Sequence, residues 1–192
     1  MARIVDWPAR VREMAEFVGL GQEELDLLRA TSQPIVKRAD ELTGAVYDNF
    51  LRFPETRKFF LEPGGEVDQE RLTRRKQSLA RWLLGSIDFK LDQDYPIRIL
   101  ATGIVHSHPP SHRAHLGSVP SRYMVASMSF IQTAIAGILS EELDDQDLAM
   151  RASAAWNKLL MVQLDILLAG YVNETPNDPA ISAGGEKESE RD

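Results

Sequence analysis

The 192-residue sequence contains no cysteine. This absence excludes disulfide bonds, thiolate zinc sites, iron–sulfur clusters and cysteine nucleophiles, so any metal must be bound by histidine, by carboxylates or by the nitrogens of a cofactor. Basic residues are also few, since 22 lysines and arginines stand against 29 acids and the net charge is −7. Because nucleic-acid binding needs a basic surface, we expect no nucleic-acid partner.

Long apolar runs are missing as well. No run approaches the ~18 residues of a membrane span, and Met1 to Phe17 lacks the apolar core of a signal peptide. We therefore expect a cytoplasmic protein with no membrane partner. The sequence also has no alternating strand pattern of any length, no internal repeat and no glycine-rich phosphate loop. These absences favour an all-α fold.

The end of the sequence, residues 175–192, differs in composition from the rest. It reads TPNDPAISAGGEKESERD, and with five acids and two bases its net charge is −3. Such a segment cannot bury enough apolar surface to offset the entropy lost on ordering. We interpret it as a disordered acidic tail, and residues 1–174 as a single folded domain.

The remaining sequence predicts a series of helices. Their approximate bounds are 9–18, 21–31, 34–53, 55–61, 68–87, 94–107, a helix that starts at Pro120, and 143–172. Apolar residues of the last helix step by four and three from Leu148 to Ala169, which is the pattern of helices packed lengthwise. Because this helix is apolar around much of its circumference, we expect it to be buried on more than one side, and we expect a homodimer through the last two helices.

All four histidines lie within ten residues, in IVHSHPPSHRAHLG: His106, His108, His112 and His115. One interpretation is a metal site built from several of them, but Pro109 and Pro110 prevent a shared helix face and the window has no carboxylate. A second is a solvated loop, which suits the last three histidines. A third is that one histidine ends an apolar helix and binds a haem iron.

His106 alone follows an apolar helical segment, residues 97–105. Ile99 and Gly103 lie seven and three residues before it and share its helix face. Glycine at this place lets a flat macrocycle or another helix approach closely. Taken alone, a histidine on such a face is more often a core residue than a metal ligand, and the residues by themselves leave both alternatives open.

Four segments resemble the haem domain of globin-coupled sensors and protoglobins, over about residues 16–171. VYDNFLRFPETRKFF (46–60) is similar to the second globin helix of that family, and ERLTRRKQSLARWL (70–83) to its distal helix. TGIVH (102–106) is similar to the proximal signature, with Thr102 in place of isoleucine, and VPSRYM (119–124) to the opening of the next helix. The resemblance implies a globin fold of the sensor type, with an extra N-terminal helix and no D helix.

The resemblance also implies a cofactor, haem b (iron protoporphyrin IX), and roles for individual residues. His106 becomes the iron ligand, since a neutral imidazole suits haem iron and leaves the opposite face open. Tyr47 becomes the distal residue, whose hydroxyl donates a hydrogen bond to bound dioxygen. The other residues that the resemblance assigns to the haem pocket are Val46, Phe50, Leu79, Gly103, Tyr123 and Ile131.

Two positions depart from the family pattern. Val46 stands where protoglobins tend to have tryptophan, and Leu79 where they tend to have phenylalanine. Both replacements are smaller than the family's residues, so the resemblance implies a more open distal side with different ligand access.

We expect a globin that reversibly binds O2, CO or NO as a gas sensor or carrier. Only the acidic segment follows the globin part in the sequence, so we expect no output domain in this chain and a separate signalling partner. Two alternatives stay open. A haem enzyme, such as a nitric oxide dioxygenase or a peroxidase-like protein, needs an electron source that the sequence does not supply. A haem-free globin acting as a signalling or partner-binding module lacks the proximal histidine that this chain has.

Overall fold

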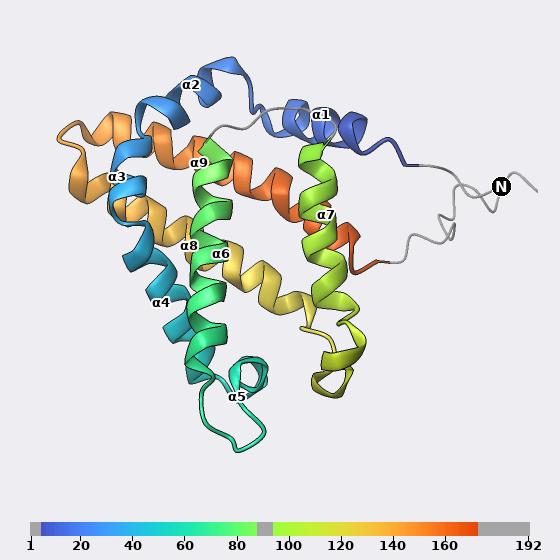
Figure 1. Ribbon diagram of the computed structural model, residues 1–192. Coiled ribbons are helices and arrows are strands. Elements are labelled where there is room, and N and C mark those ends of the chain that lie inside the picture. The colour runs from blue at the N-terminus through green and yellow to red at the C-terminus, as the bar shows by residue number, and fades with distance from the viewer. Residues whose placement is uncertain (1–4, 88–93, 173–192) are drawn as a thin grey trace, which may run out of the picture.

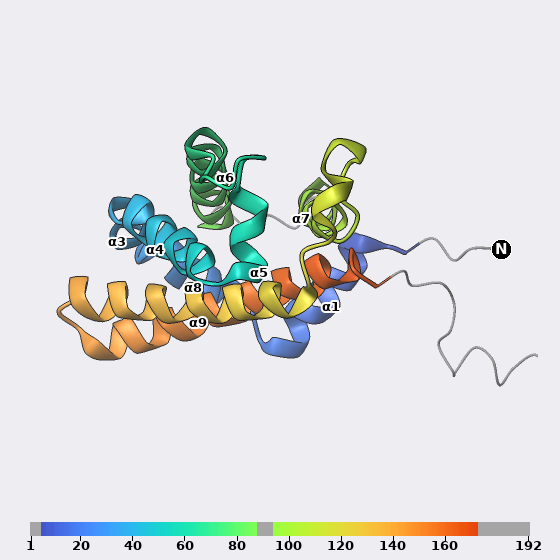
Figure 2. The same ribbon diagram turned by 90° about the horizontal axis from the view of Figure 1, so that it is seen from below.

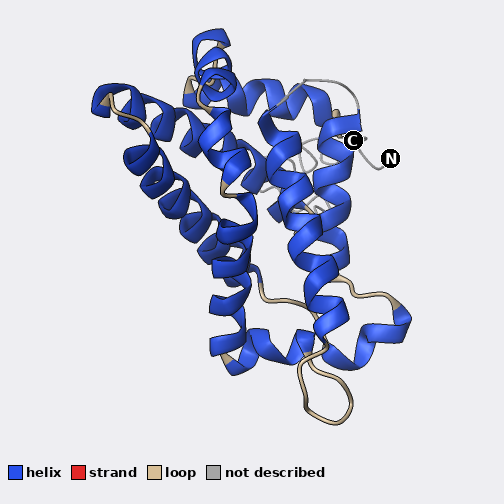
Figure 3. Ribbon diagram, turned by 60° about the vertical axis from the view of Figure 1, so that its left-hand side comes forward, coloured by secondary structure: helices blue, strands red, loops and turns tan. Residues whose placement is uncertain are grey.

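The computed structural model describes residues 5–87 and 94–172, and these residues form helices and connecting loops without a strand (Figure 3). A lone β-bridge joins Leu61 to Val67. The prediction of an all-α fold is confirmed. The helices are α1 (Trp7–Val18), α2 (Gln22–Ala30), α3 (Ser32–Lys37), α4 (Ala39–Arg52), α5 (Pro54–Arg57), α6 (Gln69–Ile87), α7 (Asp94–Ser107), α8 (Ser121–Glu142) and α9 (Gln146–Ala169), with short 3₁₀ helices η1 (Lys58–Phe60) and η2 (Ser111–Leu116).

Local sequence explains where several helices begin and end. The Asp6 side chain accepts a hydrogen bond from the Ala9 amide at 3.0 Å, and Asp145 accepts from the amides of Asp147 and Leu148 at 3.0 and 3.1 Å. These carboxylates satisfy first-turn N–H groups of α1 and α9 that have no partner within the helix. Gly19 ends α1 in the left-handed conformation, with φ of 67°, which glycine adopts without steric cost.

The helices lie in two layers (Figures 1 and 2). α8 and α9 run antiparallel along one layer, and α6 and α7 cross them in the other. α4 and α7 lie on opposite sides of α6, and α5 with η1 closes the lower end in the view of Figure 1.

The core lies along α9. Trp156, Leu159 and Leu160 are fully buried. Helices α1, α2, α7 and α8 all pack against α9 within the one chain, so the chain itself covers the apolar circumference of α9. A second copy is therefore not required to bury this helix.

A buried polar group also sits in this core. Gln163 of α9 is completely buried, and its Nε2 donates to Ser86 Oγ of α6 at 2.9 Å and to the Tyr95 hydroxyl of α7. Buried amides are costly without partners, and these bonds join three helices of both layers at one point.

Two predicted segments differ from the observed helices. The predicted helix 34–53 is divided at Arg38, where φ is −107° and ψ is 15°. No proline or glycine marks this break, and the Arg38 guanidinium is held there by Glu41 and by Glu141 of α8. The histidine-rich loop contains η2, which the sequence analysis did not predict. The predicted disordered tail lies outside the described residues.

Candidate functional site

A cavity opens at the end of the molecule where α4, α5, α6 and α7 converge. Its volume is about 120 Å³. The segments that form its wall are α4, α5 with η1, α6, α7, η2 with the loops beside it, and the start of α8. Segments far apart in the sequence therefore build one site.

His106 lies in the last turn of α7 and lines the cavity. Its Nδ1 is 2.7 Å from the carbonyl oxygen of Thr102. A carbonyl can only accept, so Nδ1 carries the proton and donates, and the neutral ring keeps its free lone pair on Nε2. Burial is the main influence on the pKa of His106 and lowers it, because a charged ring is poorly solvated there. The geometry thus favours the neutral, metal-binding form.

The chain on both sides of His106 is fixed by further bonds. Its own carbonyl accepts a hydrogen bond from the Val119 amide at 2.9 Å, and the Ser107 hydroxyl donates to the carbonyl of Gly170 at 2.6 Å. One turn earlier, Gly103 crosses α9. A Cβ on Gly103 would lie 2.1 Å from the carbonyl oxygen of Leu167 and 3.3 Å from Gly170 Cα. Of the two roles considered for Gly103, the structure thus shows the close approach of another helix.

Tyr47 lines the same cavity from α4. Its ring makes edge-to-face contacts with Phe50 and Phe60, each with ring centroids 5.5 Å apart. Burial raises the pKa of Tyr47 to about 12, so the hydroxyl stays protonated at neutral pH. No other described residue forms a hydrogen bond with it. The cavity therefore contains a protonated donor beside apolar aromatic rings.

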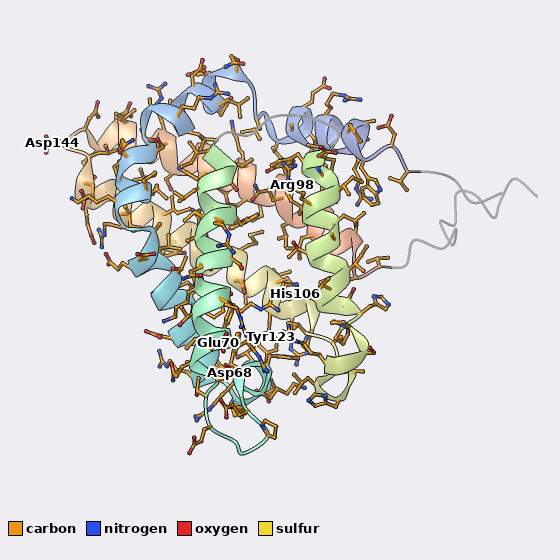
Figure 4. The ribbon with its side chains drawn as sticks, in the orientation of Figure 1. Asp68, Glu70, Arg98, His106, Tyr123 and Asp144 are labelled. Atoms are coloured by element: carbon orange, nitrogen blue, oxygen red, sulfur yellow. The ribbon has the colours of Figure 1, made fainter. Side chains whose placement is uncertain are left out.

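Figure 4 labels His106 and Tyr123, which lie on neighbouring sides of the space between α6 and α7, with Asp68 near the start of α6 at the same end of the molecule. Of the predicted site residues, Tyr47, Phe50, His106 and Tyr123 line the cavity together. The wall formed by the described residues does not include Val46, Leu79, Gly103 or Ile131. Leu79 and Ile131 pack in or against the hydrophobic core.

A second cavity lies beside the first, between α4 and α8, and Phe50, Thr56 and Tyr123 belong to both walls. Val46, which is almost completely buried, lines this second cavity rather than the first. Val46 and Tyr47, although adjacent in the sequence, therefore line different cavities.

The sequence analysis missed several wall residues. They are Arg71, Arg75 and Arg113, together with Phe59 and the loop prolines Pro109 and Pro110. The spacing of Arg71 and Arg75, four residues apart on one helix, places them on the same face. That spacing was a usable signal in the predicted helix, whereas the place of Arg113 depends on how the histidine-rich loop folds.

The comparisons with known proteins agree with this geometry. The family described as Protoglobin matches residues 8–177. The chain belongs to the protoglobin family. Membership implies a haem cofactor, and the residues of the cavity fit one, since they offer a neutral imidazole with a free nitrogen and aromatic walls.

This protoglobin is also similar to a solved structure, the globin domain of the globin-coupled sensor of Geobacter sulfurreducens. The TM-score is 0.67 at 20% sequence identity, and the match covers 83% of this chain and 96% of that one. The likeness shows the sensor-type globin fold. Whether α1 is the extra N-terminal helix, and whether the turn at Pro63 replaces the D helix, stay predictions. No curated protein has a significantly similar sequence.

Proposed function

We propose that this protoglobin holds one haem b with His106 as the iron ligand and reversibly binds O2, CO or NO on the Tyr47 side. The observation that carries the proposal is that His106 and Tyr47 line one cavity from opposite sides of α6. Haem iron supplies the coordination position for a diatomic gas. The His106 ring supplies the fixed nitrogen, because its bond to Thr102 sets both tautomer and orientation.

Tyr47 supports the gas-binding part of the proposal. Its hydroxyl has no competing partner among the described residues and remains a donor, since burial keeps its pKa at about 12. Such a donor stabilises dioxygen, which carries partial negative charge when bound, far more than it stabilises carbon monoxide. Phe50 and Phe60 keep the space around it apolar. The proposal includes four further residues behind the cavity wall rather than in it: Val46, Leu79, Gly103 and Ile131.

We assign this binding to a gas sensor or carrier. In this proposal the globin domain comprises residues 1–174, the acidic segment 175–192 lies outside it, and any signal passes to a separate cytoplasmic partner. The proposal includes a homodimer formed through α8 and α9. Exposed positions on α8, among them Val125, Ser129 and Thr133, support it, although α9 is already covered by its own chain.

The decisive experiment is the absorption spectrum of purified protein reconstituted with haem. We expect a Soret band, and we expect His106→Ala to lose the band or to require added imidazole for it. His108→Ala is the matched control, because His108 lies two residues away, is exposed and does not line the cavity. A colourless wild-type protein, or equal loss of the band in both variants, would contradict the assignment.

A further inference from the structure

Three arginine side chains line the cavity, and they differ in how they are neutralised. Arg71 Nε lies 3.1 Å from Asp68 Oδ2, and its Nη1 donates to the carbonyls of Phe59 and Leu61 at 3.3 and 3.4 Å. Arg75 of α6 and Arg113 of η2 line the same space. Neither of these two guanidinium groups forms an ion pair or a hydrogen bond with another described residue. Two unneutralised cations therefore face one cavity.

The positive charges of the arginines around the cavity act on one another. Burial lowers the pKa of the Arg113 guanidinium, and the positive charges of Arg75, Arg71 and Arg74 lower it further. Like charges repel one another, and an anion bound in the cavity would relieve this cost. Asp68 is the one carboxylate whose charge opposes the effect at Arg113, and Asp68 is already engaged with Arg71.

The position of Arg75 relative to the cavity is also defined. Its charge lowers the pKa of both Tyr47 and His106, although burial is the main influence on each and the bond to Thr102 ranks second for His106. These two residues come from helices on opposite sides of α6. Arg75 lies on α6 and lines the cavity that these two residues also line.

We propose that Arg75 and Arg113 form an anion-binding edge of this cavity that receives the two carboxylate side chains of the haem. This inference rests on the proposed function. Two cations match the two negative charges of the cofactor, and guanidinium groups bind carboxylates through paired, charge-assisted hydrogen bonds. The edge of the haem that carries the carboxylates then faces α6 and η2. In this proposal the histidine-rich segment contributes two residues to cofactor binding, His106 and Arg113.

The test compares haem with its dimethyl ester, in which both carboxylates are uncharged. Affinity is measured by competition for the cofactor with an excess of an apoglobin. We expect the wild-type protein to bind haem at least about tenfold more tightly than the ester. We expect Arg75→Gln and Arg113→Gln each to weaken haem binding about tenfold, and the double substitution to leave ester binding unchanged.

Arg81→Gln is the control, because it removes the same charge from an exposed position of the same helix, outside the cavity wall. Arg75→Lys, which keeps the charge, should recover part of the affinity, and thermal unfolding of each apoprotein verifies its fold. Equal wild-type affinity for haem and ester would overturn the inference. So would variants that keep haem affinity and lose binding of azide to the ferric protein, since the cations would then serve a small anion. Failure of the wild-type protein to bind either porphyrin would instead refute the proposed function.

Discussion

At the scale of single residues, the role proposed for Tyr47 predicts a difference between gases. We expect Tyr47→Phe to raise the oxygen dissociation rate by about one to two powers of ten, because one hydrogen bond worth on the order of 1–3 kcal/mol is removed. Carbon monoxide dissociation should change much less, since that ligand accepts hydrogen bonds weakly. Stopped-flow or flash-photolysis kinetics with both gases measure the two rates.

Tyr123 provides the control for this experiment. It is another tyrosine of the cavity wall, and it belongs to α8 rather than to α4. Tyr123→Phe removes a hydroxyl from the same space and should leave oxygen dissociation within about twofold of wild type, a change of well under 1 kcal/mol. Faster dissociation in Tyr123→Phe with none in Tyr47→Phe would show that the donor had been misassigned.

The sequence predicts some residues of the site better than others. His106 can be distinguished from the other three histidines because an apolar helical segment precedes it. Tyr47 is identified through the family resemblance. Arg113 could not be predicted, since its distance from Arg75 depends on the fold of a loop that contains two prolines. Gly103 was recognised as a point of close approach, but the sequence alone does not distinguish a cofactor from another helix.

At the scale of secondary structure, the bounds of a helix were predictable wherever the sequence itself marks them. α6 and α7 begin and end within about a residue of the predicted bounds. The break at Arg38 was not predictable, because no local signal marks it and one partner of the Arg38 side chain there is Glu141, more than a hundred residues away in the sequence. Local propensity continues through such a position, and tertiary contacts override it.

The crossing of α7 and α9 leads to a prediction about Gly103. In an exposed helix, replacing glycine by alanine stabilises by up to about 1 kcal/mol. Here the added Cβ would overlap the carbonyl of Leu167, so we expect Gly103→Ala to lower the free energy of unfolding by about 1–3 kcal/mol. Urea denaturation followed by circular dichroism measures the change.

Gly85→Ala is the matched control for this prediction. Gly85 is an exposed glycine of α6, and an added Cβ there would meet nothing within 4 Å. The two substitutions should therefore have opposite signs. A stabilised Gly103→Ala variant would mean that α7 and α9 are not in close contact in solution.

At the scale of the whole molecule, the exposed face of α8 is the feature that bears on assembly. It is the helix in the described part of the chain that is long and apolar enough to cross a membrane by length and composition, and it lies in one layer with α9. Exposed positions on it include small side chains at Ala126, Ser129, Thr133 and Gly137. A face of this kind allows two copies to approach closely.

We expect the protein to be a dimer at tens of micromolar in sedimentation equilibrium. Thr133→Arg introduces a long charged side chain in the middle of this face and should give a monomer, because an unpaired charge at an interface is costly. Thr73→Arg, at an exposed position of α6, should remain dimeric. A monomeric wild-type mass at this concentration would refute the dimer.

The bond between Ser107 and Gly170 has a consequence for how a binding event could be reported. Ser107 directly follows the proposed iron ligand, and Gly170 is the residue that caps the C-terminal end of α9. A shift of the His106 ring on ligand binding would therefore act on a hydrogen bond at the terminus of the central helix. The connection from His106 to the end of α9 therefore consists of one peptide bond and one hydrogen bond, and it lies within a single chain.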